Sequence, residues 1–400
     1  MIWTPPPRAL PNPVVIHPWS RASLGLGVAN ISAAASGTGP TTMNLYPLYL
    51  MEPFTVAKAF WCNGATVGTD SIDLGVYAMT DMATGRCDLI RSTGAVLSAG
   101  TASVVQEVSA WKVGRANLTS GNDSTDRSSA PGYTTASVTL KAGRLYLLSF
   151  VNTAADAAVA SAITGGPGWT SRSSTQFNTT GHRVSIWSGV PTVDYTGTID
   201  IAFGATQTGC CWVLDEMSGV GTSTTDGIVQ QAVGTGNSTT PLATLAAFGS
   251  ANNATYGATG VANTSTVAPG AGFTELAEAT AATPASRVET EWSVANDTTV
   301  DSTVTSGQWG MCAVEIKADT SPFVIPPSAP GVPNIYMAFV CSGSTATILR
   351  KLPGAGQNAM AGGLQGPSGS VLASTITPGT AVASSLTLPL AGFSLRSLIG

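Results

Sequence analysis

The sequence predicts an all-β protein built from tandem β-sandwich modules of a jelly-roll-like kind. Short apolar runs alternate with turn clusters and show no helical periodicity. Charged residues make up only 10% of the chain, against about 25% in an ordinary soluble domain. The 45 glycines fit a chain with many turns and bulges. The 400 residues leave room for two or three domains of about 100 to 200 residues each.

The segment 1–20 predicts an extended arm. It holds Pro5, Pro6, Pro7, Pro11, Pro13 and Pro18, and proline restricts the backbone and donates no hydrogen bond. The arm can lie along a neighbouring subunit or remain a free terminus. It lacks the basic start and long apolar run of a signal peptide, and no window of the chain approaches 18 apolar residues. We therefore expect neither export by a signal peptide nor a membrane span.

Residues 21–135 predict a first β-sandwich module. Its apolar runs are separated by turn residues in the manner of a sandwich or jelly roll. A polar stretch from Gly114 to Gly132 predicts a long loop, which either connects modules or projects with a function of its own. The expected strands are Tyr46–Leu50, Val56–Trp61, Ile72–Met79, Cys87–Arg91 and Val104–Trp111.

Residues 136–319 predict a duplicated β-sandwich region, with units at about 136–221 and 227–317. Gly168-Trp-Thr170 followed by the run Arg183–Ser188 recurs as Gly272-Phe-Thr274 followed by Arg287–Ser293. Repeats of this kind indicate equivalent structural units. We expect two packed sandwiches rather than one larger closed sandwich, with Trp187 and Trp292 at equivalent buried positions. The internal repeat also pairs residues 145–152 with residues 242–252.

Residues 320–400 predict a proline-rich linker and an apolar C-terminal segment. Pro322, Pro326, Pro327, Pro330 and Pro333 favour a semi-rigid connection. The tail from Asn334 onward is apolar, Gly-rich and almost uncharged, so exposing it would carry a risk of aggregation. We expect the arm or this tail to contact a second copy of the chain.

Charge and cysteine content exclude some partners. A net charge of −5 with only 17 Lys and Arg provides no basic patch for several phosphates, so we expect no nucleic-acid partner. Six cysteines without framework spacing or CxxC pairs indicate buried thiols in the reduced state. If a disulfide forms, Cys62 and Cys87 are the favoured pair.

The residue types that build catalytic centres are scarce. The only histidines are His17 and His182, and no nucleophile elbow, zinc-protease motif or phosphate loop is present. We expect no enzymatic activity, no cofactor and no metal. Turn-associated Asp70, Asp73, Asp81 and Asp88 offer oxygen ligands for Ca²⁺, but they lack the order of a calcium loop.

Two pairs of acidic residues are the best candidates for a catalytic role. Glu289 and Glu291 on one strand face would lie roughly 7 Å apart, a spacing used by inverting glycosidases. The competing interpretation is a solvated strand face, which we favour because this spacing arises readily by chance. Asp215 and Glu216 close an apolar strand, where we expect one carboxylate to point outward and the other to cap a turn.

The tryptophans predict a core and two candidate ligand contacts. Trp61, Trp187, Trp212 and Trp292 lie in apolar strand-like runs and are expected to be buried. Trp111 and Tyr133 flank the polar loop and are the candidate ligand-binding residues, through stacking on a saccharide. Packing in the core is the alternative for both.

Two sets of motifs resemble modules of tailed-bacteriophage proteins. The runs Asp73–Ala78, Gly94–Gly100 and Val104–Gln106 resemble a module of minor tail and fibre-associated proteins. The pattern of Gly168-Trp-Thr, Arg183–Trp187 and Trp212–Gly219 is similar to a β-sandwich repeat from the same setting. Together they cover roughly residues 40 to 317. The resemblance supplies no catalytic or ligand residues.

The resemblance implies a virion structural protein, located at the tail tip or in the fibre and adsorption apparatus. The expected partners are other virion proteins and further copies of the chain, with a trimer favoured by analogy to fibre-like parts. Such a protein is made in the host cytoplasm. A capsid decoration or head-fibre protein is one alternative, and an adhesin that binds host-envelope glycans is another.

Overall fold

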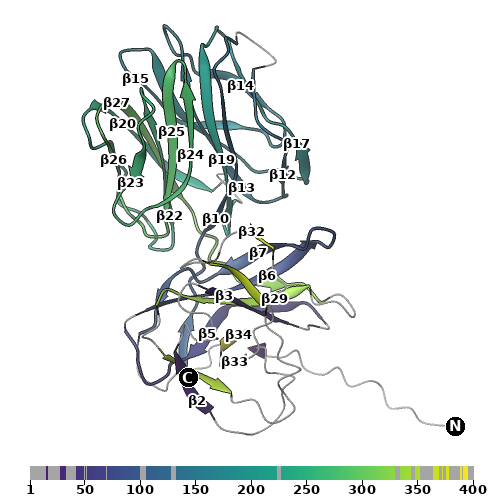
Figure 1. Ribbon diagram of the computed structural model, residues 1–400. Helices are drawn as coiled ribbons and strands as arrows, with labels where there is room; N and C mark the ends of the chain where they lie inside the picture. The colour runs from purple at the N-terminus through teal and green to yellow at the C-terminus, as the bar shows by residue number, and fades with distance from the viewer. Residues whose placement is uncertain are drawn as a thin grey trace, which may run out of the picture. The chain divides into compact units, whose positions relative to one another are not determined.

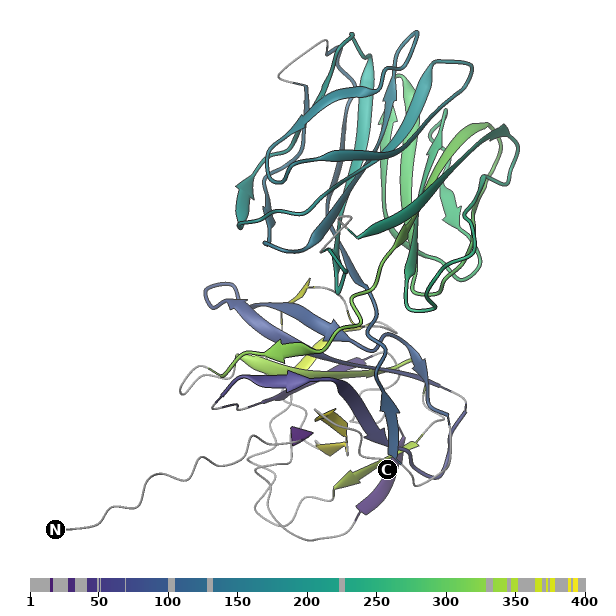
Figure 2. The ribbon, with the colours of Figure 1, turned by 180° about the vertical axis from the view of Figure 1, so that it is seen from behind.

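The computed structural model confirms the all-β fold class. It describes residues 15–16, 28–32, 42–48, 50, 52–68, 70–99, 105–127, 132–222, 227–328, 334–343, 347–351, 364–368, 372, 375–377, 388–389 and 391–394. These residues form β-strands, turns and bends, and none of them is helical. Accordingly, the described part contains no helix long and apolar enough to span a membrane. The fold is shown in Figure 1 and, from behind, in Figure 2.

The chain divides into two compact units. The first unit comprises 1–110, 321–372 and 376–400, and the second comprises 111–320 and 373–375. We expected the first boundary near residue 135, at the end of a polar loop. The boundary instead lies near residue 110, because the polar stretch that follows is a strand of the second unit. The arm at 1–20 lies outside the described residues except for two residues that form a strand.

The first unit contains strands from both ends of the chain. They are β1 (Val15–Ile16), β2 (Val28–Ser32), β3 (Thr42–Pro47), β4 (Phe54–Val56), β5 (Lys58–Cys62), β6 (Ser71–Asp81), β7 (Arg86–Ser92), β8 (Val96–Leu97), β9 (Val105–Val108), β28 (Phe323–Ile325), β29 (Ile335–Cys341), β30 (Thr347–Lys351), β31 (Leu364–Ser368), β32 (Thr375–Ile376), β33 (Leu388–Pro389) and β34 (Ala391–Ser394). The largest sheet has the order β31-β3-β29-β6-β7-β32, with β8 also on β6. A second sheet has the order β1-β34-β5-β9.

The segment after residue 320 therefore belongs to the first unit, which corrects its expected role as a linker and separate tail. Strand β29 lies between β3 and β6, and all its residues from Ile335 to Cys341 are buried. Strand β34 pairs with both β1 and β5. The apolar character that suggested contact with another subunit instead serves, in these strands, to complete the chain's own sheets.

The second unit begins with ten strands that form its first half. They are β10 (Gly114–Asp123), β11 (Tyr133–Thr134), β12 (Val138–Leu140), β13 (Leu145–Thr153), β14 (Ala160–Thr164), β15 (Thr170–Phe177), β16 (His182–Gly189), β17 (Tyr195–Gly197), β18 (Asp200–Phe203) and β19 (Gly209–Ser218). A five-stranded antiparallel sheet has the order β10-β19-β13-β16-β15. A small sheet of order β11-β18-β14 and the pair β12-β17 accompany it.

The second half repeats this plan with eight strands. They are β20 (Ile228–Asn237), β21 (Leu242–Thr244), β22 (Ala254–Val261), β23 (Val267–Pro269), β24 (Thr274–Ala282), β25 (Ala285–Ser293), β26 (Thr299–Val304) and β27 (Gln308–Ile316). The sheet orders are β20-β27-β22-β25-β24 and β21-β26-β23. Each strand thus occupies the place of its counterpart in the first half. The structural counterpart of β13 is β22. The sequence repeat had instead suggested the segment 242–252.

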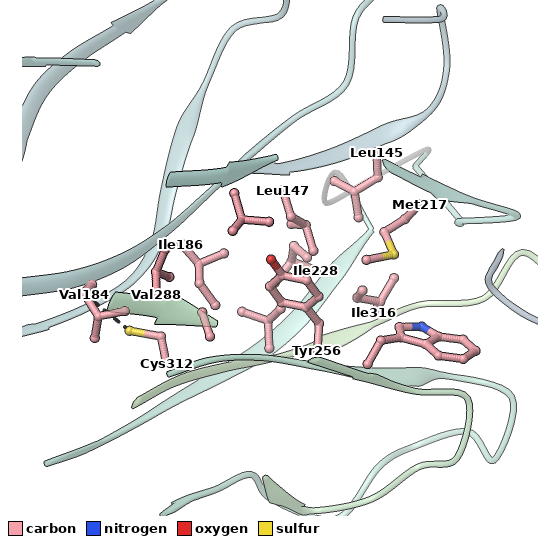
Figure 3. Packing of buried hydrophobic residues seen from close by; sticks show 14 of the residues in the cluster. Leu145, Leu147, Val184, Ile186, Met217, Ile228, Tyr256, Val288, Cys312 and Ile316 are labelled. Atoms are coloured by element: carbon pink, nitrogen blue, oxygen red, sulfur yellow. Dashed lines mark hydrogen bonds between the residues drawn. The ribbon is translucent and has the colours of Figure 1, made fainter. Parts of the chain in front are cut away.

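The two five-stranded sheets pack face to face and share one hydrophobic core. Edge strands β10 and β15 contact β24 and β20 of the other half, so an approximate twofold axis relates the halves. The core takes Leu147 and Ile186 from the first half and Tyr256 and Val288 from the second. Figure 3 shows these side chains interlocking, with the Cys312 thiol next to the Val184 carbonyl. Each half is a sandwich, and the shared core joins the two sandwiches into one unit.

Each half also has an outer core, between its five-stranded sheet and its small sheet. In the first half this core is aromatic, with Phe150, Trp187, Phe203 and Trp212 among its members. In the second half it contains smaller residues such as Val261 and Val300 beside Trp309. Because side chains alternate along a strand, each central strand contributes to the shared core with one face and to its outer core with the other.

The stretch from Gly114 onward is a strand, not the loop that its polarity suggested. Among the described strands, β10 pairs with β19 alone and lies at the edge of its sheet, so many of its side chains meet water. An edge strand with a solvated face carries polar residues without losing its backbone pairing. Residues 128–131 of the expected loop lie outside the described residues.

Candidate functional site

Glu289 and Glu291 form a buried acid pair in the outer core of the second half. Both lie on β25 and alternate with Val288 and Trp292, which face the shared core. Neither side chain has any exposed surface. The solvated strand face that we favoured is therefore wrong. A polysaccharide cannot reach either carboxyl in this conformation, which also removes the pair as an exposed glycosidase site.

The acid pair has almost no hydrogen-bond partners. The Gly270 N–H donates to Glu291 Oε2 at 3.1 Å. Both oxygens of Glu289 and the remaining oxygen of Glu291 are buried without a partner. Burial, reinforced by the neighbouring charge of Glu291, raises the pKa of Glu289 well above its usual value. Burial also raises the pKa of Glu291 to about 8, against the opposing effect of the Gly270 hydrogen bond.

The neighbours on β24 add further acids to the same face. Glu278 is the cross-strand partner of Glu289, and Glu275 is the partner of Glu291. Arg287 forms an ion pair with Glu278 and donates to the Thr264 carbonyl at 2.8 Å, so its charge is directed away from the acid pair. The carboxyls thus run from exposed Glu275 through half-buried Glu278 to the two fully buried groups.

The equivalent positions of the first half carry no acid. Strand register places Trp187 opposite Leu148, and Glu291 opposite Gly257, at matching sites of the two halves. It likewise matches Ser185 with Glu289. A Cβ on Gly257 would lie 2.6 Å from Val300 and 3.0 Å from Glu291 Oε1, so the glycine provides the space that the Glu291 carboxyl occupies. Where the first half has an indole and a leucine, the second half thus has a carboxyl and a glycine.

Other buried carboxyls in this unit are fully provided with donors. Glu216 accepts from Tyr146 Oη at 2.7 Å and pairs with Arg144 at 2.6 Å. Its counterpart Glu315 accepts from Gln230 Nε2 at 2.6 Å and Asn253 Nδ2 at 2.5 Å. Satisfied carboxyls of this kind are the rule for buried polar groups, which makes the unpartnered acid pair an exception within its own fold.

Asp215 lies in the shared core and also has partners. It accepts from Tyr256 Oη at 2.9 Å and from Asn117 Nδ2 at 3.0 Å, while Tyr256 Oη also bonds Ser149 Oγ at 2.7 Å. Burial raises the pKa of Asp215 to about 6, although these hydrogen bonds oppose the shift. The expectation that Asp215 or Glu216 points outward and the other caps a turn is wrong, because both are fully buried within β19.

The two aromatic candidates for ligand binding are core residues. Trp111 and Tyr133 have no exposed surface. Tyr133 Oη donates to the carbonyl oxygens of Thr125, at 3.0 Å, and Gln207, at 2.9 Å. Neither side chain can stack on a saccharide in this conformation. Their position beside a polar stretch suggested exposure, but that stretch is largely an ordered strand.

The remaining candidates do not assemble into a site. Asp73 accepts from the Leu372 N–H at 2.8 Å, and Asp88 pairs with Arg86 at 2.9 Å. Within the described ranges, no three His, Cys, Asp or Glu side chains are arranged to hold a metal ion. The side chain of Asp81 lies outside the described residues. All six cysteines are free, so Cys62 and Cys87 are not joined.

Comparison with known proteins identifies no relative. The chain matches no protein-family model and no curated protein. Among solved structures, a chain from the structure of infectious bursal disease virus Gt strain is 7% identical, and the match covers 98% of this chain and 88% of that chain. Its TM-score is 0.10, which is too low to support any argument about fold or function.

Proposed function

We propose that this protein is a structural component of a tailed-bacteriophage virion, a minor tail protein of the tail tip or the fibre and adsorption apparatus. The observation that carries the proposal is the internal duplication of the second unit, in which two sandwiches share one core. We expect the two five-stranded sheets, which pack against each other through the shared core, to be the rigid part of this module. A rigid centre in a chain with few charges suits a part that bears contacts in a particle.

The sequence resemblance to tail and fibre modules supports the same proposal and spans both units. Burial of Trp111 and Tyr133 favours this structural role over the glycan-binding adhesin, because it removes the side chains on which that alternative rested. Burial of Glu289 and Glu291 likewise weighs against a glycan-degrading activity at that pair.

Labelling of intact particles tests the proposal. Antibodies against the purified chain, detected by electron microscopy, are expected to decorate the tail tip or its fibres. Labelling of the capsid alone would support the alternative of a decoration or head-fibre protein and would overturn the tail assignment. Absence of label from purified, chemically opened particles would overturn a virion role altogether.

Assembly with further copies of the chain is part of the proposal, and a trimer is expected by analogy with fibre-like parts. Mass measurement of the purified full-length chain tests this point. A symmetric oligomer supports it, and a monomer at all accessible concentrations contradicts it. Binding to host-envelope glycans by the purified oligomer, in a pull-down from cell walls, would restore the adhesin alternative.

A further inference from the structure

The second half of the second unit contains two acids that its fold leaves without a counter-charge. The Glu289 and Glu291 carboxyls share one face of β25, and three of their four oxygens accept no hydrogen bond. If both ionised, two negative charges would lie next to each other in a site without exposed surface. Burying one unpaired charge is already costly, and a second like charge adds to that cost.

The charged groups that surround the pair increase the free-energy cost of ionising both acids. On β24 the facing charged groups are Glu275 and Glu278, and Arg287 of β25 is committed to Glu278. Asp297, before β26, and Asp301, in β26, contribute negative charge toward Glu291, and Asp215 of β19 does so toward Glu289. Every charged neighbour except the occupied arginine is therefore acidic. At least one proton must reside on the pair for the closed arrangement to persist.

The small outer sheet that covers the acid pair has the shortest strands of this half. It consists of the short strands β21, β26 and β23. Among the described residues, three hydrogen bonds that involve side chains link these strands and the adjoining Gly270 to the sheet below. They are Gly270 N–H to Glu291 Oε2, Val267 N–H to Glu278 Oε1 at 2.9 Å, and Ser302 Oγ with Thr259 Oγ1 at 3.0 Å. One of these three bonds ends on the acid pair itself. Short elements with few links open at lower free energy than the sheets they cover.

We propose that Glu289 and Glu291 form a proton-dependent latch, which holds the sheet β21-β26-β23 closed over the second half while the pair keeps a proton and releases it as pH rises. The closed state binds more protons than the open state, because burial favours the neutral acids. By linkage, the stability of the closed state is greatest in acid and declines as pH increases. The proton also gives the pair an O–H donor that its oxygens otherwise lack.

The first half is an internal control. Its sheet β11-β18-β14 covers Trp187 and Leu148 at the matching positions, and neither side chain titrates. Opening of that sheet should therefore depend on pH much less than opening of its counterpart. The latch is accordingly a property of Glu289 and Glu291 in the second copy, and not of the duplicated fold.

Hydrogen–deuterium exchange of the full-length chain between about pH 5.5 and about pH 8.5 tests the latch, after correction for the pH dependence of chemical exchange. We expect the opening equilibrium of β23 and β26 to rise by up to about tenfold per pH unit for each proton released, while β14 and β18 change little. Glu289→Gln with Glu291→Gln should abolish this dependence. Glu275→Gln, on the same face but exposed, should retain it.

Three outcomes would overturn the proposal: an unchanged pH dependence in the double glutamine variant, an equal dependence in β18, or suppression of the dependence by millimolar Ca²⁺ in the unaltered chain. The last result would mean that the pair holds a cation rather than a proton. If the double variant fails to fold, each single variant must show a weaker dependence than the unaltered chain, and a full dependence in both would also contradict the latch.

Discussion

Trp187 and Trp292 lie on equivalent strands of the two halves but point into different cores. Trp187 pairs with Leu148 and belongs to the outer core of the first half, whereas Trp292 pairs with Tyr256 and belongs to the shared core. The expectation of equivalent buried positions is therefore right for the strand and for burial, and wrong for the face. The extra residue between Arg287 and Trp292, relative to Arg183 and Trp187, shifts the second indole by one position, which reverses its direction.

Trp187→Ala and Trp292→Ala should each destabilise a different core of the second unit. Each change is expected to lower the free energy of unfolding of the second unit by about 3 to 5 kcal/mol, because it removes a large buried side chain. Hydrogen exchange should rise first in β14 and β18 for Trp187→Ala, and in both five-stranded sheets for Trp292→Ala. Trp169→Ala, at a half-buried position, is the milder control. Identical exchange patterns for the two buried sites would contradict the assignment to different cores.

Asp215 should make the shared core less stable as pH rises through the mildly acidic range. Its pKa is about 6 in the folded chain and 3.8 ordinarily, so the folded state holds a proton that the unfolded chain loses. As pH rises from about 4 to about 6, the free energy of unfolding is therefore expected to fall by up to roughly 3 kcal/mol. Above that range it should stay low. Urea unfolding followed in this window should show the decline, and Asp215→Asn should flatten it. A decline that persists unchanged in Asp215→Asn would assign the effect to other groups.

Arg144 should stabilise the second unit far more than the neighbouring Lys141 does. Arg144 neutralises Glu216, whose side chain is fully buried, whereas Lys141 pairs with Asp194, whose side chain is 57% exposed. Arg144→Ala is expected to cost about 3 to 5 kcal/mol, because it removes a positive charge that pairs with a buried carboxylate. Lys141→Ala should cost about 0 to 1 kcal/mol. Denaturant unfolding of both variants measures the difference, and equal effects would refute the burial argument.

Deletion of residues 334–400 should unfold the first unit and spare the second. Strand β29 lies between β3 and β6, so its loss leaves two buried strands with open edges. All strands of the second unit's two halves lie between Gly114 and Ile316, outside the deleted segment. Limited proteolysis should remove the first unit quickly and leave the second intact. Deletion of 395–400 alone is the control, and a protected first unit in the longer deletion would contradict the role of β29.

The sequence by itself determined the fold class, the duplication and the main apolar strands. Alternating and continuous apolar runs bounded by turn residues are local signals, and they persist whatever the strands pack against. The second unit's halves were visible for the same reason, since the repeated Gly-aromatic-Thr and Arg-Val patterns lie at nearly constant spacing. The strand pattern also located β5, β6, β7 and β9 to within a few residues.

The tertiary structure decided what each face of those strands meets, and this placed the candidate residues Glu289, Glu291, Trp111 and Tyr133 in the interior. The sequence pattern places Glu289 and Glu291 on one face of a strand, but whether that face meets water depends on a small sheet contributed by distant strands. Trp111, Tyr133 and the edge strand β10 were misjudged for the same reason. Burial is set by contacts between residues far apart in the chain, so a local polar context cannot predict it.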